Sequence, residues 1–139
     1  MTDDRRLPEG VPMPKLIHDL PNAPAAVGPY SIATEANGFV FVSGQIGLDP
    51  ERGRVVDGGT AVETRRIMEN LKAILADLDL DLSHVVKTTV FLTDIKDFAV
   101  FNEIYGDYFS GHDPARSTVE VSNLPLGVNV EVEILAARD

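Results

Sequence analysis

The stretch TAVETRRIMENLKAILADL (Thr60–Leu78), followed by VVKTTVFL (Val85–Leu92), decides the fold class of this chain. In the first segment, apolar residues recur mostly at three- and four-residue spacings, which is typical of an amphipathic helix. These residues are Val62, Ile67, Leu71, Ile74, Leu75 and Leu78. The second segment is rich in β-branched residues that alternate along a predicted strand. One predicted face of this strand holds Val86, Thr88, Val90 and Leu92. A helix followed by a strand predicts a helix packed on a sheet.

The residues before this helix predict a hairpin. Ser31–Glu35 and Phe39–Ser43 have the character of strands, and they flank Asn37-Gly38, a strong signal for a two-residue turn. Lys15–Asp19 is a possible short strand before them. At the start of the long helix, Thr60 and Glu63 have the spacing of a capping box.

The residues after Leu92 predict a second helix and two more strands. The helix runs from about Asp97 to Phe109, with Asp94 as a cap at its entrance. The strands are Arg116–Val121 and Val128–Ala136. The resulting order, β-β-β-α-β-α-β-β, predicts an α+β fold in which two helices pack on one face of a mixed sheet. An apolar second face of that sheet would predict oligomerisation.

Composition narrows the class of protein. The length of 139 residues and the hydrophobic fraction of 44% fit one globular domain, expected over residues 15–139. Residues 1–14, with three prolines, are predicted to form a flexible tail. The net charge of −10 argues against nucleic-acid binding, which needs clustered lysine and arginine. The absence of cysteine excludes disulfides and thiolate chemistry. With neither a signal-peptide pattern nor a membrane-spanning run, we expect a cytoplasmic protein without membrane contact.

Arg116 is the candidate site residue that stands out against this acidic background. Placed on a strand near a loop, an arginine offers a rigid fork of N–H groups to a carboxylate or phosphate. Taken alone, the residue fits two interpretations. It either pairs with one of the many acidic side chains, which is the commoner case, or it binds a small anionic ligand.

Other candidates have equally plain alternatives. The segment around Ser43 and Gly44 either presents backbone N–H groups to an anion or simply ends a strand. Glu131 lies either on a solvated sheet face or in a cleft as a general base. Tyr30 is either a packed aromatic or a group that orients ligand or water. The histidines His18, His84 and His112 lack paired metal-ligand spacing, so no metal site is expected.

Six short motifs, in order along the chain, resemble the RidA/YjgF family of reactive-intermediate deaminases. They are NAPAAVGPY (Asn22–Tyr30), VSGQI (Val42–Ile46), NLKAI (Asn70–Ile74), VKTTVFL (Val86–Leu92), PARS (Pro114–Ser117) and VEVE (Val130–Glu133). Each motif is modest alone, but the ordered set is highly specific. The resemblance extends from about Pro21 to Arg138.

The resemblance implies a chorismate-mutase-like (YjgF-like) fold that assembles as a homotrimer. The sheets of the trimer would form an inner barrel, with ligand clefts between subunits. The implied activity is hydrolysis of 2-imino acids, such as 2-iminobutanoate and 2-iminopropanoate, to 2-oxo acids and ammonia. No metal or organic cofactor is implied.

The same resemblance implies roles for individual residues. Arg116 matches the arginine that holds the substrate carboxylate, and Glu131 matches the glutamate that positions water. The matched cleft-lining residues are Tyr30, Ser43, Gly44 and Asn102. Thr118 stands where many relatives carry cysteine. If that position acts through its backbone, the change matters little; if the thiol matters, a property such as sensitivity to oxidation is lost here. The loop 110–114 is shorter than in the best-known members, which affects the expected substrate range.

Competing functions follow from the same residues. The cleft of a non-catalytic binding module would hold a 2-oxo acid or another small carboxylate through Arg116. A chaperone-like interaction protein would work through its surface and would not need Arg116. Ribonuclease activity is the least favoured function because the chain is acidic and lacks a basic patch.

Overall fold

The computed structural model describes residues 13–139. Its elements are β1 (Lys15–Ile17), β2 (Ala33–Ala36), β3 (Phe39–Gln45), β4 (Leu48–Asp49), β5 (Arg54–Val55), α1 (Thr60–Asp77), β6 (Val85–Leu92), α2 (Phe98–Tyr108), β7 (Ala115–Glu120) and β8 (Val130–Ala137). Three short 3-10 turns lie at Leu82–His84, Ile95–Asp97 and Pro125–Gly127. The predicted tail, residues 1–14, lies outside the described residues except for its last two.

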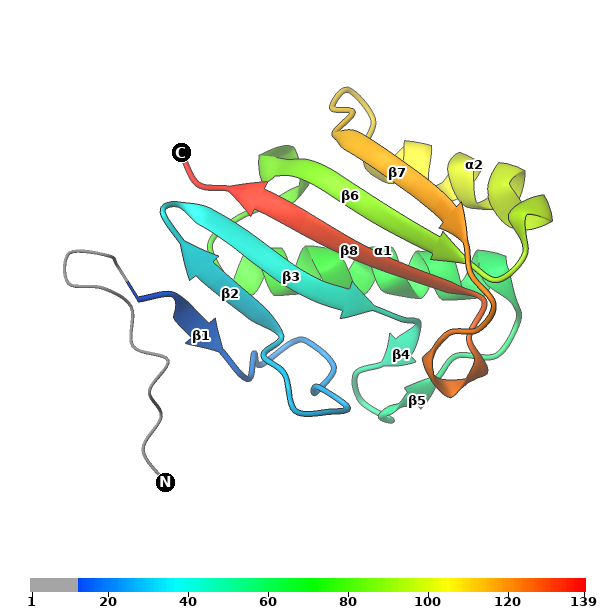
Figure 1. Ribbon diagram of the computed structural model, residues 1–139, viewed down its shortest axis with the longest axis horizontal. Helices are drawn as coiled ribbons and strands as arrows, with labels where there is room; N and C mark the ends of the chain where they lie inside the picture. The colour runs from blue at the N-terminus through cyan, green and yellow to red at the C-terminus, as the bar shows by residue number, and fades with distance from the viewer. Residues whose placement is uncertain (1–12) are drawn as a thin grey trace.

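The main sheet is mixed and has six strands in the order β1-β2-β3-β8-β6-β7. The pair β6 and β7 is parallel, and α2 connects these two strands; the other pairs are antiparallel. Both helices cover the same face of the sheet (Figure 1). The predicted α+β class, with two helices on a mixed sheet, is therefore confirmed. The short β4–β5 ribbon beside the sheet was not predicted.

The core forms where α1 meets the central strands. β8 contributes alternate residues to it, and Val130, Val132 and Ile134 are all buried. From α1, the predicted face contributes Ile67, Leu71, Ile74, Leu75 and Leu78, all buried. Val62 is an exception, because 37% of it is exposed. Val62 precedes Ile67 by five residues, a spacing that turns it about 140° around the helix from Ile67 and away from the buried stripe.

The start of α1 differs from the predicted capping box. The N-cap is Gly59, and no side chain caps the first turn. Instead, Thr60 Oγ1 donates to Asp97 Oδ2 at 2.7 Å, and the Glu63 carboxylate binds Asn129. Both side chains therefore connect α1 to distant segments, which local spacing cannot reveal.

The predicted hairpin is confirmed. Asn37 (φ 52°) and Gly38 (φ 81°) join β2 to β3, and both have the positive φ that a two-residue hairpin turn between twisted strands requires.

The predicted face of β6 is wrong at its start, since Val86 is exposed and Val85 is buried. A register irregularity between Val85 and Lys87 reverses the alternation there.

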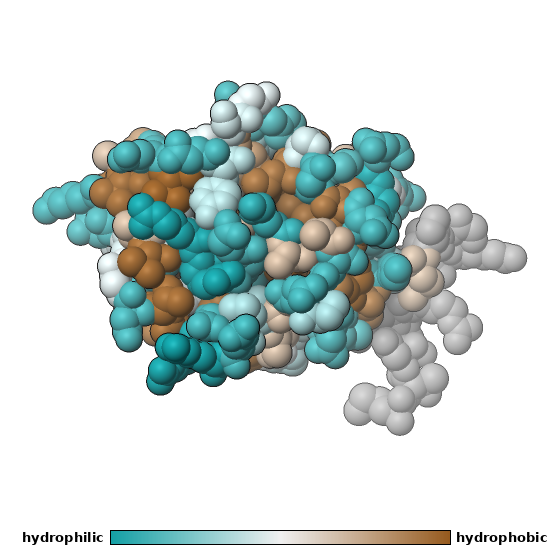
Figure 2. All heavy atoms as spheres, turned by 180° about the vertical axis from the view of Figure 1, so that it is seen from behind, coloured by the Kyte–Doolittle hydropathy of each residue, from teal (hydrophilic) through white to brown (hydrophobic). Residues whose placement is uncertain are grey.

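The sheet face opposite the helices carries large exposed apolar side chains. Leu16, Thr34, Phe41 and Leu135 are successive cross-strand partners, and they alternate with core residues. Leu16 and Phe41 are about half exposed (55% and 48%), as are Phe39 and Val119. We refer to this surface as the open sheet face. The opposite side of the molecule, seen in Figure 2, mixes hydrophilic residues with separate hydrophobic patches.

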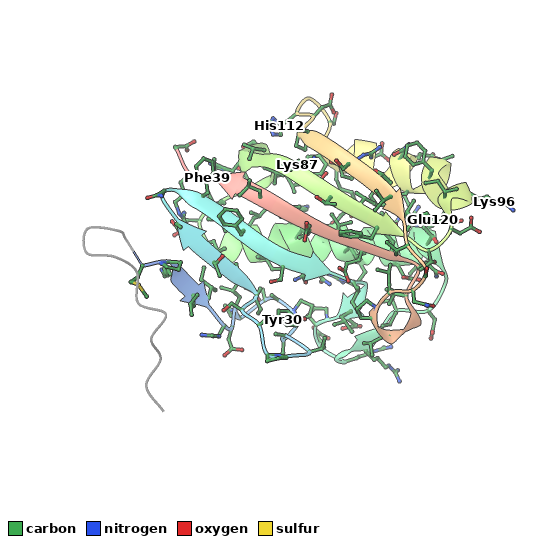
Figure 3. The ribbon with its side chains drawn as sticks, in the orientation of Figure 1. Tyr30, Phe39, Lys87, Lys96, His112 and Glu120 are labelled. Carbon is green, nitrogen blue, oxygen red and sulfur yellow. The ribbon has the colours of Figure 1, made fainter. Side chains whose placement is uncertain are left out.

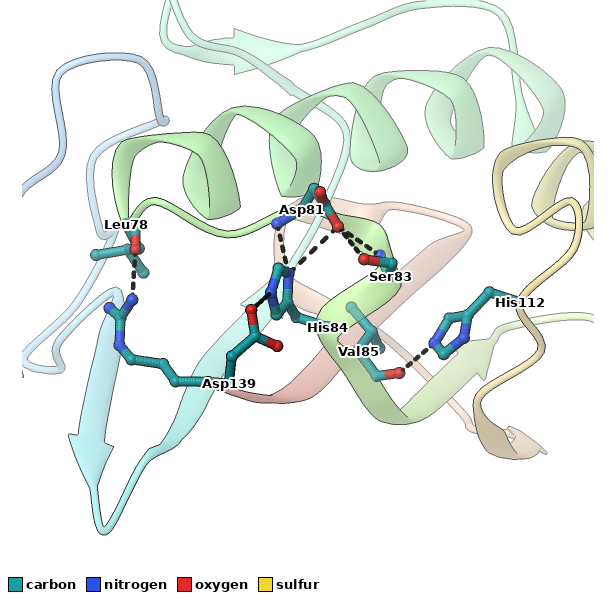
Figure 4. A network of polar contacts seen from close by, with 8 residues as sticks. Leu78, Asp81, Ser83, His84, Val85, His112 and Asp139 are labelled. Atoms are coloured by element: carbon teal, nitrogen blue, oxygen red, sulfur yellow. Dashed lines mark hydrogen bonds and ion pairs between the residues drawn. The ribbon is translucent and has the colours of Figure 1, made fainter.

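The end of β8 is joined to the end of α1 by a polar network (Figure 4). Arg138 donates to Leu78 O at 2.8 Å and forms a bidentate pair with Glu35 at 2.7 and 3.0 Å. His84 Nε2 lies 3.3 Å from Asp139 Oδ2, and its Nδ1 accepts from the Asp81 backbone N–H at 3.1 Å.

Within residues 13–139, no helix has the length and apolar character needed to cross a bilayer.

Candidate functional site

Glu131 lines a small cavity at one end of the sheet. The cavity has a volume of about 40 Å³, and its wall includes Tyr30, Gly44, Ile46, Leu48 and Pro125. Glu131 is half-buried. Burial raises the pKa of its carboxyl group above the usual value, and the nearby charge of Glu133 raises it further. A carboxylate with a raised pKa beside a cavity can orient water and accept its proton.

Gly44 leaves the space that the Glu131 carboxylate occupies. A Cβ atom at position 44 would lie 2.5 Å from Glu131 Oε2 and 2.8 Å from its carboxyl carbon. Any larger residue would therefore displace the carboxylate. The absence of a side chain at Gly44 lets Glu131 lie against the β3 backbone.

Tyr30 and Ser43 lie at the same end of the molecule. Tyr30 is 44% exposed, and its hydroxyl accepts a hydrogen bond from the Val27 backbone N–H at 3.3 Å. Figure 3 shows Tyr30 in the loop before β2, across the sheet from β7. The Ser43 hydroxyl donates to Ser31 O at 2.7 Å, so its proton already has a partner in the backbone. Ser43 can therefore offer a ligand its remaining lone pairs or its backbone, but not a free donor.

Arg116 lies on β7, where its guanidinium group stacks on aromatic rings of α2. The guanidinium carbon is 4.8 Å from the ring centroid of Tyr105, 5.5 Å from Phe98 and 5.8 Å from Phe101. These distances are typical of cation–π contacts, which hold the charged group near the rings without using its N–H donors. We call these three residues the aromatic cradle.

Arg116 makes no ion pair with any carboxylate of residues 13–139. The interpretation that it neutralises a surface acid is therefore not supported, although acids outnumber bases in this chain. Tyr105, beneath it, shares a 2.8 Å hydrogen bond with Thr88. That bond fixes the ring, and burial raises the pKa of the Tyr105 hydroxyl. An unpaired arginine held in one place can receive an anion without first breaking an ion pair.

Two further candidate residues belong to the elements that hold Arg116. Thr118 follows two residues later on β7, and so projects to the same side of the strand. Asn102 lies on the α2 stripe that carries the cradle. Within the described part of the chain, Asn102 Oδ1 and Thr118 Oγ1 are buried side-chain atoms without a hydrogen-bond partner. Unpaired buried oxygens are costly unless a ligand or water satisfies them.

The candidate residues thus form two separate groups in one chain. Arg116 pairs with Thr88 of β6, which is fully buried on the helix-covered side. Glu131 alternates with buried Val130 and Val132, so it points to the open sheet face. Arg116 and Glu131 therefore project to opposite faces of the sheet. A single chain cannot bring them to one small ligand.

The aromatic cradle is the part of the candidate site that sequence reasoning missed. Its signal was present, since Phe98, Phe101 and Tyr105 recur at three- and four-residue spacings on the predicted second helix. What the sequence did not show was that this stripe faces β7.

Within residues 13–139, no group of three or more acidic or histidine side chains is arranged to hold a metal ion.

Known proteins resemble this chain along most of its length. Residues 20–138 match the model of the family described as Endoribonuclease L-PSP. Protein DfrA of Myxococcus xanthus is 52% identical over 124 residues, which cover 88% of this chain and 94% of that protein. The human protein named 2-iminobutanoate/2-iminopropanoate deaminase is 46% identical over 116 residues, which cover 84% of this chain and 85% of the human one.

A solved structure with a similar fold is that of E. coli TdcF with bound serine. It has a TM-score of 0.83 and 38% sequence identity, and the match covers 90% of this chain and 100% of that one. The bound serine was observed in TdcF. The present chain shares the fold and part of the sequence of that protein.

Proposed function

Because this chain belongs to the Endoribonuclease L-PSP family, which includes the RidA/YjgF proteins, we propose that it hydrolyses reactive 2-imino acids to 2-oxo acids and ammonia. The substrates we propose are small, such as 2-iminobutanoate and 2-iminopropanoate. Human, mouse and rat relatives that bear the corresponding deaminase name are 46–47% identical to it. No cofactor is required for this reaction.

The observation that carries the proposal is the state of Arg116. Its guanidinium is stacked on the aromatic cradle and makes no ion pair within residues 13–139. A fork that is positioned but unpaired suits a planar carboxylate, which it can bind through two parallel hydrogen bonds. Such binding also explains how an anionic ligand is captured by a protein with a net charge of −10.

The complete site requires a second copy of the chain, since Arg116 and Glu131 project to opposite faces of the sheet. We propose a homotrimer with a chorismate-mutase-like arrangement, in which the open sheet faces form an inner barrel. Its clefts would join Arg116 of one copy to Glu131 of a neighbour. The exposed apolar residues Leu16, Phe39 and Phe41 support this arrangement, because an apolar sheet face of this kind is stabilised by burial.

The proposed reaction divides between the two groups. Arg116 holds the substrate carboxylate, which fixes the C=N carbon relative to the cavity beside Glu131. Glu131, assisted by Tyr30, orients a water molecule and takes one of its protons as the water oxygen adds to the imine carbon. Glu131 passes this proton to the former imine nitrogen, which gives the carbinolamine. As the C–N bond breaks, the proton of the carbinolamine hydroxyl is transferred to the nitrogen, so ammonia leaves, the 2-oxo acid forms and one water is consumed for each ammonia released.

The second candidate function is binding of small carboxylates without catalysis. One observation favours it: TdcF of E. coli, a structural neighbour, was solved with bound serine, which carries a carboxylate. The same Arg116 fork would hold such a ligand. This function predicts tight, Arg116-dependent binding of 2-oxo acids with little acceleration of imine hydrolysis.

A direct assay separates these functions. 2-Iminobutanoate is generated in solution, and 2-oxobutanoate formation is followed with wild type, Arg116→Ala and Arg116→Lys. We expect clear acceleration by wild type and loss in both variants, because a lysine cannot reproduce the bidentate fork. The oligomeric state of each variant is the control. Unchanged hydrolysis by Arg116→Ala would rule out the proposed reaction at this site.

A further inference from the structure

A buried carboxylate on α1, that of Glu63, belongs to a residue that contacts neighbours of the residues lining the Glu131 cavity. Glu63 is only 3% exposed, yet it forms no ion pair with any residue of 13–139. Its Oε1 accepts from the Asn129 backbone N–H at 2.9 Å, and its Oε2 accepts from Asn129 Nδ2 at 2.6 Å. Both oxygens are thus committed to one residue. Asn129 directly precedes β8 and stands two positions before Glu131.

The same part of α1 also contacts the corner between β3 and β4. A Cβ atom on Gly47 would lie 3.0 Å from the Cα of Glu63, so the two backbones are in close contact. One and two turns further along, Arg66 Nε donates to Asn70 Oδ1 at 3.1 Å, and Asn70 Nδ2 donates to Leu48 O at 2.8 Å. Asn70 is fully buried.

These contacts fix two walls of one cavity. The corner supplies Ile46 and Leu48 to the cavity wall, the segment before β8 supplies Pro125, and β8 itself supplies Glu131. Asn129 is further held by the Thr93 N–H, which donates to its carbonyl oxygen at 3.1 Å. The β8 segment therefore enters the sheet in a position set by Glu63 on one side and by β6 on the other.

A carboxylate is an expensive choice for a buried position whose role is packing. Burial of a charge is unfavourable unless hydrogen bonds compensate, and apolar replacements for buried ionic groups are often as stable. The two bonds to Asn129 are charge-assisted and directional. What the carboxylate adds over an apolar side chain is a fixed position for the backbone at residue 129.

We propose that Glu63 is a positioning residue for Glu131: through Asn129, it fixes the entry of β8 and hence the place of the Glu131 carboxylate against Gly44. The catalytic consequence of this positioning role rests on the proposed function. Glu63 touches neither the substrate nor the attacking water. A displacement of about 1 Å in a catalytic group can lower a rate a hundredfold, so the effect should appear in kcat.

The matched variants are Glu63→Ala and Glu63→Gln. Alanine removes both acceptors. Glutamine keeps the shape: its carbonyl oxygen accepts from the Asn129 N–H, and its amide donates to Asn129 Oδ1 once the Asn129 amide rotates. We expect Glu63→Ala to lower kcat at least about tenfold with KM within about threefold, because Arg116 lies in the other group. Glu63→Gln should retain kcat within about threefold.

A general loss of stability needs its own control. Glu35→Ala removes a bidentate ion pair with Arg138 at the opposite end of β8. All variants are assayed well below the unfolding temperature of the least stable one. We expect Glu35→Ala to keep wild-type kcat. A kcat for Glu63→Ala within twofold of wild type, or an equal loss in Glu35→Ala, would overturn the inference.

A second readout is independent of imine hydrolysis. Backbone amide resonances of Gly44 and Glu131 are compared by NMR in the four proteins. We expect both resonances to move in Glu63→Ala and to stay close to wild type in Glu63→Gln and Glu35→Ala. Unmoved resonances in Glu63→Ala would refute the positioning role. Absence of hydrolysis in wild type would instead refute the proposed function, and the NMR comparison would still decide the role of Glu63.

Discussion

Among single residues, Arg116 and Tyr105 act as a unit. The Tyr105 ring lies 4.8 Å from the guanidinium carbon, and Thr88 holds the tyrosine hydroxyl at 2.8 Å. The stacked arginine loses little freedom on binding a ligand, because it is already ordered. This preorganisation favours ligand binding, because the conformational entropy of the arginine side chain is not lost when the ligand binds.

The cradle can be tested at Tyr105. Tyr105→Leu removes the ring face and should weaken binding of 2-oxobutanoate by about three- to tenfold, the range expected for one lost cation–π contact. Tyr105→Phe keeps the face and should bind as wild type, while losing about 1 kcal/mol of stability because Thr88 loses its partner. Calorimetric titration measures the first effect. Equal binding by all three proteins would show that the cradle does not position Arg116.

The ionisation of Glu131 gives a pH prediction. Its pKa is raised by burial and by Glu133. A general base works when ionised, so activity should fall as the pH drops through this raised value. Glu133→Gln removes the like charge, lowers the pKa of Glu131, and should shift the acidic limb of kcat/KM to lower pH. A limb that stays in place or moves upward would exclude Glu131 as the titrating base.

Among the elements, α1 shows the limits of the helical pattern. Leu71 is fully buried, whereas Val62, which the same pattern placed on the apolar face, is 37% exposed. Leu71→Ala should cost about 2–5 kcal/mol of unfolding free energy through the cavity it leaves. Val62→Ala should change it by no more than about 0.5 kcal/mol. Urea denaturation at one fixed protein concentration measures both, and similar losses would contradict the orientation of α1.

The end of β8 contains a histidine that should respond to pH. The pKa of His84 is raised, first by its hydrogen bond to Asp139 and then by the charges of Asp139 and Asp81. The stabilisation is therefore complete below the ordinary histidine pKa of about 6.5 and is lost as the pH rises through the raised folded value. The Tm difference between wild type and Asp139→Asn should be largest near pH 6 and vanish by about pH 9. A difference that grows with pH would contradict this assignment.

Local signals explain which elements the sequence could predict. Asn37-Gly38 fixed the hairpin because the turn needs residues that accept positive φ. The apolar stripe from Ile67 to Leu78 predicted α1, because its three- and four-residue spacings place these residues on one side of a helix. The capping box failed because Thr60 and Glu63 bind segments far along the chain. The face of β6 failed at Val86 because a register irregularity depends on the partner strand.

At the scale of the whole molecule, the site is divided between faces. The sequence motifs single out Arg116 and Glu131 as candidate site residues. Their orientation could not be predicted, because it follows from the strand order β8-β6-β7 and from the parallel pairing of β7. These are long-range properties. The family resemblance implied a cleft between subunits for both residues, and the fold permits a shared cleft only between copies.

Subunit mixing tests that conclusion. Arg116→Ala and Glu131→Gln should each be inactive alone. If a cleft joins Arg116 of one copy to Glu131 of another, unfolding and reassembling an equal mixture restores activity. In random assembly, about one contact in four unites both intact residues, so about a quarter of wild-type activity should return. Each variant treated alone is the control. No recovery in demonstrably mixed oligomers would place both residues in the same copy.

The stacking of Arg116 also has a spectroscopic consequence. Protons held over the face of an aromatic ring experience its ring current and resonate upfield of their usual positions. Arg116 faces three rings, so its side-chain signals should be separated from those of the other arginines. A ligand that draws the guanidinium toward itself changes that shielding. One side chain can thus serve as a label-free reporter of occupancy and of ligand exchange in solution.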